Sequence, residues 1–267
     1  MEIAAFLAAT LIGLSLGMIG AGGSILTVPV LVYLAGVDPV LATGYSLFVV
    51  GSTALVGGLK SARRGMVDLK TAALFGVPSI LAVYATRLWL MPLIPDQLFS
   101  LGSFTLTKGT GLLLMFAVLM IATSVSMIRE RKSVEPEDGE KHKPRNILYV
   151  FGEGVGVGVL TGMVGAGGGF LIIPALVLLA GLEMKIAVGT SLFIIAAKSL
   201  FGFIGDIQNG ELINWSFLAV FTGFSVAGIF VGSWLAGYVN GNKLKKAFGW
   251  FVLVMGVYMV VRETVFA

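Results

Sequence analysis

The segment GMIGAGGSILTVPVLVYLAG at residues 17–36 recurs as GMVGAGGGFLIIPALVLLAG at residues 162–181, a shift of 145 residues. The same shift carries Gly44 onto Gly189 and Ser46-Leu47-Phe48 onto 191–193 without a gap. A shared bias toward apolar residues would not place glycine, proline and serine in one register. The chain therefore contains an internal duplication.

The composition of the chain is typical of a polytopic membrane protein. Of its 267 residues, 57% are hydrophobic and 12% are charged, and the mean hydropathy is +0.98. Soluble domains carry about 25% charged residues, which is roughly twice as many. The composition excludes a nucleic-acid-binding protein, a secreted disulfide-bonded domain and a disordered regulator.

Each half of the chain contains apolar stretches in a matching series, most of them long and one short. In the first half they lie at about 3–20, 24–37, 40–59, 68–90 and 106–128, and in the second half at about 147–164, 169–182, 185–205, 214–239 and 244–262. The short stretch, SILTVPVLVYLAG in the first half, would form a helix of about 20 Å, against a hydrocarbon core of about 30 Å. The sequence therefore predicts an all-α polytopic membrane protein of two repeats, each with about five helical segments: four long ones and a short one after a glycine-rich break.

One charged linker separates the two repeats. The stretch RERKSVEPEDGEKHKPR at 129–145 holds 11 of the 32 charged residues and the only histidine, His142. It has no apolar periodicity, so we expect an exposed linker rather than a membrane helix. The predicted organisation is a membrane repeat at 1–128, a linker at 129–146 and a second membrane repeat at 147–267.

The distribution of lysine and arginine predicts how the repeats cross the membrane. The loop at 60–70 carries four basic residues, whereas its counterpart at 205–214 carries two acidic residues and none that is basic. Cytoplasmic loops are enriched in lysine and arginine, which places the linker and the 60–70 loop inside the cell and both termini outside. Equivalent loops then lie on opposite faces, so the repeats are inverted; short segments that only dipped into the membrane would make them parallel. Inverted repeats with interrupted helices are typical of secondary transporters.

The two glycine-rich clusters form the candidate binding site. Glycine permits positive φ and close backbone approach, and backbone that breaks a helix at membrane depth persists only where it is buried in protein or lines a polar cavity. The half-helix that begins at Ser24 or Gly169 directs the positive end of its dipole at the break, and two such ends would hold an anion. The candidate residues are Gly22, Gly23, Ser24, Gly167, Gly168 and Gly169. The alternative role of these glycines is close helix packing.

Polar side chains further along each repeat extend this site. Ser46, Thr190 and Ser191 would bind substrate oxygens, and a hydrogen bond to a carbonyl one turn back is the alternative. Lys198 is the one basic residue deep inside an apolar stretch, SLFIIAAKSLFGF, and its counterpart in the first repeat is Thr53. Because a lysine charge is costly to bury, we expect Lys198 to face the interior and to contact an anionic substrate.

Three other ionisable residues lie within or beside the apolar stretches. Glu153 is the candidate for carrying a coupling proton, and solvation near the interface is the alternative. Arg87 and Lys108 lie near the outer ends of their stretches, where we expect them to anchor at the membrane interface. No nucleophile–base pair is apparent, and the chain has no cysteine and a single histidine. The sequence therefore predicts no enzyme, no metal site and no cofactor.

The duplicated Gly-x-Gly-Gly break, its short proline-containing helix and the following Ala-x-Gly-x-Ser-Leu segment resemble the sulfite exporter TauE/SafE family of membrane transporters. The resemblance covers both halves of the chain. It implies transport of small sulfur-containing anions such as sulfite, sulfoacetate or other organosulfonates by a secondary mechanism. Carried onto this chain, it again points to Gly22, Gly23 and Ser24 in the first break and to 167–169 in the second. Gly169 stands where the first break has Ser24, so the two sides of the pocket differ chemically.

We therefore expect a secondary transporter in the cell membrane that moves a small sulfur-containing anion by alternating access. The alternative is a passive anion channel that uses the same breaks as its filter. The expected partners are the anionic substrate and the lipid bilayer, with a homo-oligomer left open and no nucleic acid.

Overall fold

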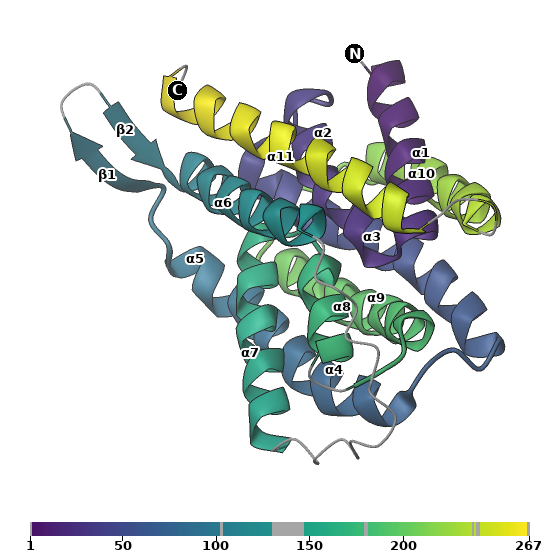
Figure 1. Cartoon of the computed structure of the whole chain (residues 1–267). Coiled ribbons are helices and arrows are strands. Elements are labelled where there is room, and N and C mark those ends of the chain that lie inside the picture. The colour runs from purple at the N-terminus through teal and green to yellow at the C-terminus, as the bar shows by residue number, and fades with distance from the viewer. Residues whose placement is uncertain are drawn as a thin grey trace.

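The computed structural model describes residues 2–101, 104–129, 147–178, 181–236, 238 and 241–265. The first half of the chain forms α1 (Glu2–Ile19), η1 (Ala21–Leu26), α2 (Thr27–Tyr33), α3 (Pro39–Arg63), α4 (Leu69–Ala85), η2 (Thr86–Leu90), α5 (Met91–Leu93), β1 (Gln97–Leu101), β2 (Phe104–Thr107) and α6 (Lys108–Ile128). The second half forms α7 (Ile147–Val164), α8 (Gly169–Leu178), α9 (Met184–Gln208), α10 (Trp215–Leu235) and α11 (Gly241–Val265). The described helices pack into a bundle, and the antiparallel β1–β2 hairpin projects from it (Figure 1).

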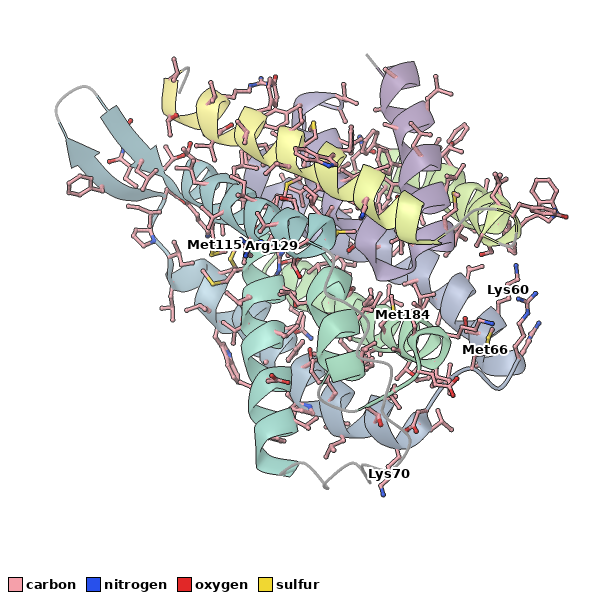
Figure 2. The ribbon with its side chains drawn as sticks, viewed as in Figure 1. Lys60, Met66, Lys70, Met115, Arg129 and Met184 are labelled. Atoms are coloured by element: carbon pink, nitrogen blue, oxygen red, sulfur yellow. The ribbon has the colours of Figure 1, made fainter. Side chains whose placement is uncertain are left out.

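The predicted all-α polytopic membrane fold is confirmed. Within the described part of the chain, 6 helical spans are long and apolar enough to cross a membrane. They are Pro39–Arg63, Leu69–Leu93, Lys108–Ile128, Met184–Gln208, Trp215–Leu235 and Lys246–Val265. Figure 2 shows Lys60 and Lys70 at the periphery of the bundle, pointing away from the helices.

The duplication in the sequence is repeated in the backbone. Helices α7 and α9 begin and end 145 residues after α1 and α3. The left-handed glycines recur at the same shift: Gly20 and Gly165, Gly36 and Gly181, and Gly65 and Gly210 all have φ between 67° and 78°. Because other residues adopt this conformation only under strain, the spacing of these glycines fixes where each chain segment turns.

Short polar residues define where the long helices start. Asp38 caps α3 by accepting hydrogen bonds from the backbone N–H groups of Val40 and Leu41, and Pro39 occupies the first turn, where no N–H is needed. Asp68 caps α4 and Asn214 caps α10 in the same way. These caps fix the starts of α3 and α4 after the first break and of α10 after the second, whereas α9 begins at Met184 without a side-chain cap.

Helices of one half pack mainly against helices of the other. The largest contacts join α3 with α9, α6 with α11, α1 with α10 and α4 with α7. Helices α3 and α9 run antiparallel, since Gly44 lies against Asp206 and Gly58 against Phe193. Helices α6 and α11 also run antiparallel, since Gly249 lies against Met127 and Gly256 against Ile121. The orientation of the two halves in a membrane remains a prediction.

The structure differs from the sequence prediction at the first half-helix. The segment after Gly20 begins as the 3₁₀ helix η1, and α2 begins only at Thr27. Pro29 therefore lies in the first turn of α2, where its missing N–H removes no intrahelical hydrogen bond. In the second half, α8 begins at Gly169 as predicted. Except for Arg129, the predicted linker at 129–146 with His142 lies outside the described residues.

Candidate functional site

The two glycine breaks have different backbones. Gly20 ends α1 with φ 77° and Gly165 ends α7 with φ 74°. The first break then winds into η1, whereas Gly167 and Gly168 in the second break are both left-handed, with φ 63° and 68°. The chemical asymmetry predicted from Ser24 and Gly169 thus extends to the shape of the main chain.

Each break packs against the long helix of the other half. Gly165 lies directly on the backbone of Thr43 in α3, and Gly20 lies on the side chain of Val188 in α9. Thr43 and Val188 are 145 residues apart, so the two contacts are equivalent. η1 also contacts α8, which brings the two short segments together.

Gly167 lies at the centre of this arrangement. A Cβ atom at Gly167 would lie 2.6 Å from Val50 Cγ1 and 3.3 Å from Ile195 Cγ2. Val50 and Ile195 are also separated by the 145-residue shift. The second break therefore sits where equivalent positions of α3 and α9 meet.

Lys198 lies beside the second break and is fully buried. Its Nζ donates a hydrogen bond of 2.8 Å to Thr161 Oγ1, and a Cβ atom on Gly168 would be 2.8 Å from the same Nζ. In the part of the chain that the structure describes, no carboxylate forms an ion pair with this ammonium group. The expectation that Lys198 faces the interior is confirmed by its burial, whereas its contact with a substrate remains a prediction.

Thr161 is a neighbour of Lys198 that the sequence did not single out. Its hydroxyl donates to Val157 O at 2.7 Å, which leaves its oxygen free to accept from Lys198. Thr53, the counterpart of Lys198, instead hydrogen-bonds to Val49 O and to the hydroxyl of Ser225. Of these two equivalent positions, 198 carries a basic side chain beside its break and 53 does not.

The candidate hydroxyl groups have separate environments. Thr190 accepts a hydrogen bond of 3.0 Å from the backbone N–H of Asp68. Tyr45, its counterpart, accepts one of 2.6 Å from the backbone N–H of Asn214. These two side chains hold the segments that precede α4 and α10, so the contact that Thr190 makes here is structural.

The other polar candidates are buried or half-buried within their helices. Ser191 donates to Val188 O at 2.8 Å, which is the intrahelical alternative considered from the sequence. Ser46 Oγ is buried and has no hydrogen-bond partner among the described atoms. Ser24 is fully buried in η1, and Glu153 is half-buried in the second turn of α7. Gly22 and Gly23 both lie in η1, where Gly23 rests on the hydroxyl of Ser15.

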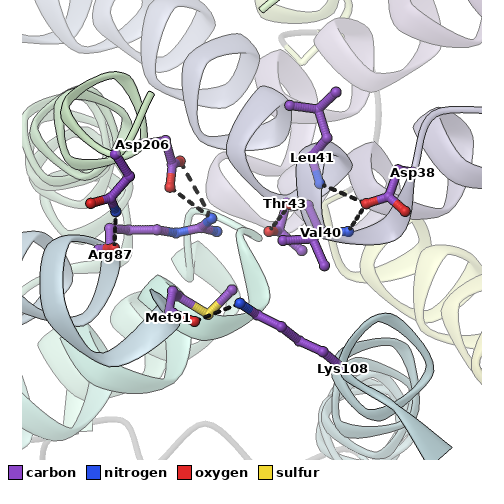
Figure 3. A network of polar contacts seen from close by, with 9 residues as sticks. Asp38, Val40, Leu41, Thr43, Arg87, Met91, Lys108 and Asp206 are labelled. Atoms are coloured by element: carbon purple, nitrogen blue, oxygen red, sulfur yellow. Dashed lines mark hydrogen bonds and ion pairs between the residues drawn. The ribbon is translucent and has the colours of Figure 1, made fainter. Parts of the chain in front are cut away.

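The prediction that Arg87 anchors at the membrane interface is wrong. Only 1% of Arg87 is exposed, and its Nη1 lies 3.3 Å from both carboxylate oxygens of Asp206 (Figure 3). Its backbone carbonyl accepts a hydrogen bond from the side chain of Asn209. Arg87 has the long side chain of an interfacial anchor, but it lies inside the bundle because it pairs with the carboxylate of Asp206 from the other half of the chain. Lys108, expected to be a second anchor, is half-buried and donates to the carbonyl of Met91.

Three polar residues of α9 lie at regular intervals along the helix. Thr190, Lys198 and Asp206 follow one another at intervals of eight residues, which is about 12 Å along a helix. Lys198 is the middle one and lies near the centre of α9. The site around Lys198 is therefore separated from both ends of the helix.

A bundle of apolar helices with broken segments and a buried lysine is typical of a membrane transporter. Residues 5–259 match the sulfite exporter TauE/SafE family, and the chain belongs to that family.

Similar proteins described as probable membrane transporters agree with the assignment to membrane transporters. The chain is 29% identical over 256 residues to a probable membrane transporter protein of Xylella fastidiosa, with 95% of this chain and 92% of the relative covered. It is 28% identical over 263 residues to the probable membrane transporter protein YunE of Bacillus subtilis, with 91% and 89% covered. No solved structure matches the chain.

Proposed function

We propose that this protein is a secondary transporter that moves small sulfur-containing anions, such as sulfite, sulfoacetate or other organosulfonates, across the cell membrane by alternating access. The observation that carries the proposal is the position of Lys198, a fully buried amine in contact with the second glycine break. A membrane protein retains a buried lysine when the charge serves a bound ion or a pathway. An anionic substrate would supply the negative charge that the described residues do not offer to Lys198.

The break itself adds donors to this site. The N–H groups of Leu171 and Ile172 donate to Gly168 O, so the donors that α8 offers to a ligand are those of its first two residues, and the helix dipole adds partial positive charge at the same end. Glycine at 168 allows the break to lie directly against Lys198, because a side chain there would overlap Thr161 and crowd the ammonium group. We assign Gly167, Gly168, Gly169 and Lys198 to the substrate, together with Gly22, Gly23 and Ser24 from the first break.

The antiparallel pairing of α3 with α9 supports a rocking motion. Helices at equivalent positions in inverted repeats must run in opposite directions, as these two do. Motion of one repeat against the other at this contact would open the region around Gly167 to each side in turn. In this scheme the 60–70 loop and the linker are cytoplasmic and both termini are outside.

The proposal predicts saturable exchange of sulfite. In proteoliposomes loaded with unlabelled sulfite, the purified protein should accumulate radiolabelled sulfite against its gradient, and the rate should saturate with concentration. Vesicles without protein provide the background. A passive channel, the second candidate, would equilibrate the label without saturation and without acceleration by sulfite on the far side. Absence of exchange for sulfite and for a panel of organosulfonates in folded protein would overturn the assigned substrate class.

We assign the coupling proton to Glu153, which lies in α7 at a partly buried position. A carboxylate there can take up a proton on one side of the membrane and release it on the other. In Glu153→Gln protein, an imposed pH gradient should no longer accelerate sulfite uptake, while counterflow at equal pH should persist. A response to the gradient equal to that of the parent protein would remove this role from Glu153.

A further inference from the structure

The guanidinium group of Arg87 is buried and only partly paired. Its Nη1 contacts both oxygens of Asp206, but Nε and Nη2 are buried and have no hydrogen-bond partner within the described residues. Nε–H and one Nη2–H point in the same direction and form one edge of the guanidinium plane. That edge matches two oxygens of an oxyanion, which is the geometry in which arginine binds carboxylate, sulfate and phosphate groups.

Both members of the ion pair line a cavity. It has a volume of about 190 Å³ and is lined by Gly44, Tyr45, Arg87, Lys108, Asp206 and Asn209, among others. A water molecule occupies about 30 Å³ in the liquid, so the cavity has room for a small oxyanion and a few waters. Gly44 allows the carboxylate of Asp206 to lie close against α3, because a Cβ atom there would lie 2.8 Å from Asp206 Oδ2.

The charges around the cavity favour an anion. Asp206 neutralises one edge of Arg87, and Lys108 adds a second positive charge with two ammonium hydrogens not used by its bond to Met91 O. Glu211 also lines the cavity, but it is exposed, so water screens its charge. Figure 3 shows Arg87 and Lys108 approaching the same region from different helices.

The backbone at Arg87 is also unusual. Residues Thr86–Leu90 form a π-helical turn, η2, inserted between α4 and α5. Such turns carry an extra residue, are costly relative to regular α-helix and are common at functional sites. Here the turn lies at the place where Arg87 meets Asp206.

We propose that Arg87 and Lys108 form a second binding site, for a small oxyanion of the sulfite or sulfate class, at the end of α9 that carries Asp206. Asp206 lies eight residues beyond Lys198, or about 12 Å along the helix, so this site is distinct from the one at the second break. The assignment of a sulfur oxyanion rests on the proposed function, whereas the presence of an oxyanion site rests on the cavity and the unpaired edge of Arg87. An anion held here would lie between the α9–α10 loop and the central site.

Calorimetric titration of the purified full chain with sulfite, and separately with sulfate, tests this site. The Lys198→Met variant is used as the background, because it removes the positive charge of the central site. We expect this variant to bind one oxyanion per chain, and we expect the added change Arg87→Lys to weaken binding at least tenfold. Lysine keeps the charge but lacks the two-donor edge. The exposed Lys70→Met, added to the same background, is the charge control and should leave binding unchanged.

Two further variants keep the test decisive if Arg87→Lys does not fold. Lys108→Met leaves the Arg87–Asp206 pair intact and should also weaken binding at least tenfold. Glu211→Gln removes a negative charge from the wall and should bind the anion as tightly as the background or more tightly. The proposal is overturned if the Lys198→Met protein binds neither anion, or if Lys108→Met binds like its background. Failure of sulfite counterflow with this binding intact would instead remove only the proposed transport function.

Discussion

The Lys198→Met protein is expected to lose sulfite counterflow while becoming no less stable than the parent. Truncation of one member of a buried charge interaction typically costs about 2–5 kcal/mol of binding, which corresponds to a loss of roughly 30-fold to several thousand-fold in affinity. Methionine has nearly the length of the lysine stem and no charge, so the packing in α9 is largely kept. Thr161 retains its own hydrogen bond to Val157 O.

The stability of this variant separates a functional role from a structural one. A lysine charge at the centre of a membrane costs about 2.5–3.5 kcal/mol on insertion scales, and in the described residues only a neutral hydroxyl compensates it. Removing that charge should therefore raise the unfolding temperature in detergent, measured in the absence of substrate. A structural lysine would behave in the opposite way: its loss would lower the unfolding temperature and leave exchange intact in the folded fraction.

The exposed lysine at position 70 supplies the matched control. Lys70 points away from the bundle, at the opposite extreme of burial from Lys198 (Figure 2). Lys70→Met makes the same chemical change and should alter neither the exchange rate nor the unfolding temperature appreciably. Normal counterflow in Lys198→Met would place the substrate elsewhere.

The backbone of this fold is predictable from the sequence because the same motifs occur in both halves of the chain. Glycines that recur at a fixed shift marked the two breaks, and the length of the apolar stretches distinguished long helices from short ones. Lys198 was found by a simpler argument, since a cation within an apolar stretch needs a buried partner or a ligand. Each of these signals is local, or is repeated along the chain.

The pair formed by Arg87 and Asp206 had no such signal. The two residues are separated by 119 positions, and the 145-residue shift carries them onto Gly232 and Ser61, which offer no corresponding charges. Nothing in either apolar stretch shows that η2 and α9 bring these side chains together. Thr161 was missed for the same reason, because its contact with Lys198 depends on how α7 packs beside α9.

Replacement of Gly168 by alanine is expected to abolish sulfite counterflow and to destabilise the protein. Gly168 has φ 68°, a conformation that costs a residue with a Cβ atom about 1–2 kcal/mol. The added Cβ would also overlap the methyl group of Thr161 and lie 2.8 Å from Lys198 Nζ. Overpacking of this kind costs about 1–3 kcal/mol, so the free energy of unfolding should fall by roughly 2–5 kcal/mol in total.

Substitutions at two other glycines distinguish the effect of backbone strain from the effect of crowding by the added Cβ atom. Gly36 has φ 69° but nothing within 4 Å of an added Cβ, so Gly36→Ala should carry the backbone strain alone and retain counterflow. Gly152 lies in α7 with nothing within 4 Å and an ordinary helical backbone, so Gly152→Ala should be neutral or slightly stabilising. Thermal unfolding in detergent and counterflow in vesicles give both readouts for all three variants. If Gly168→Ala resembled Gly36→Ala in both measurements, the close contact between the second break and Lys198 would not be needed for transport. Loss of counterflow only in Gly168→Ala, beyond what its stability explains, would tie transport to that contact.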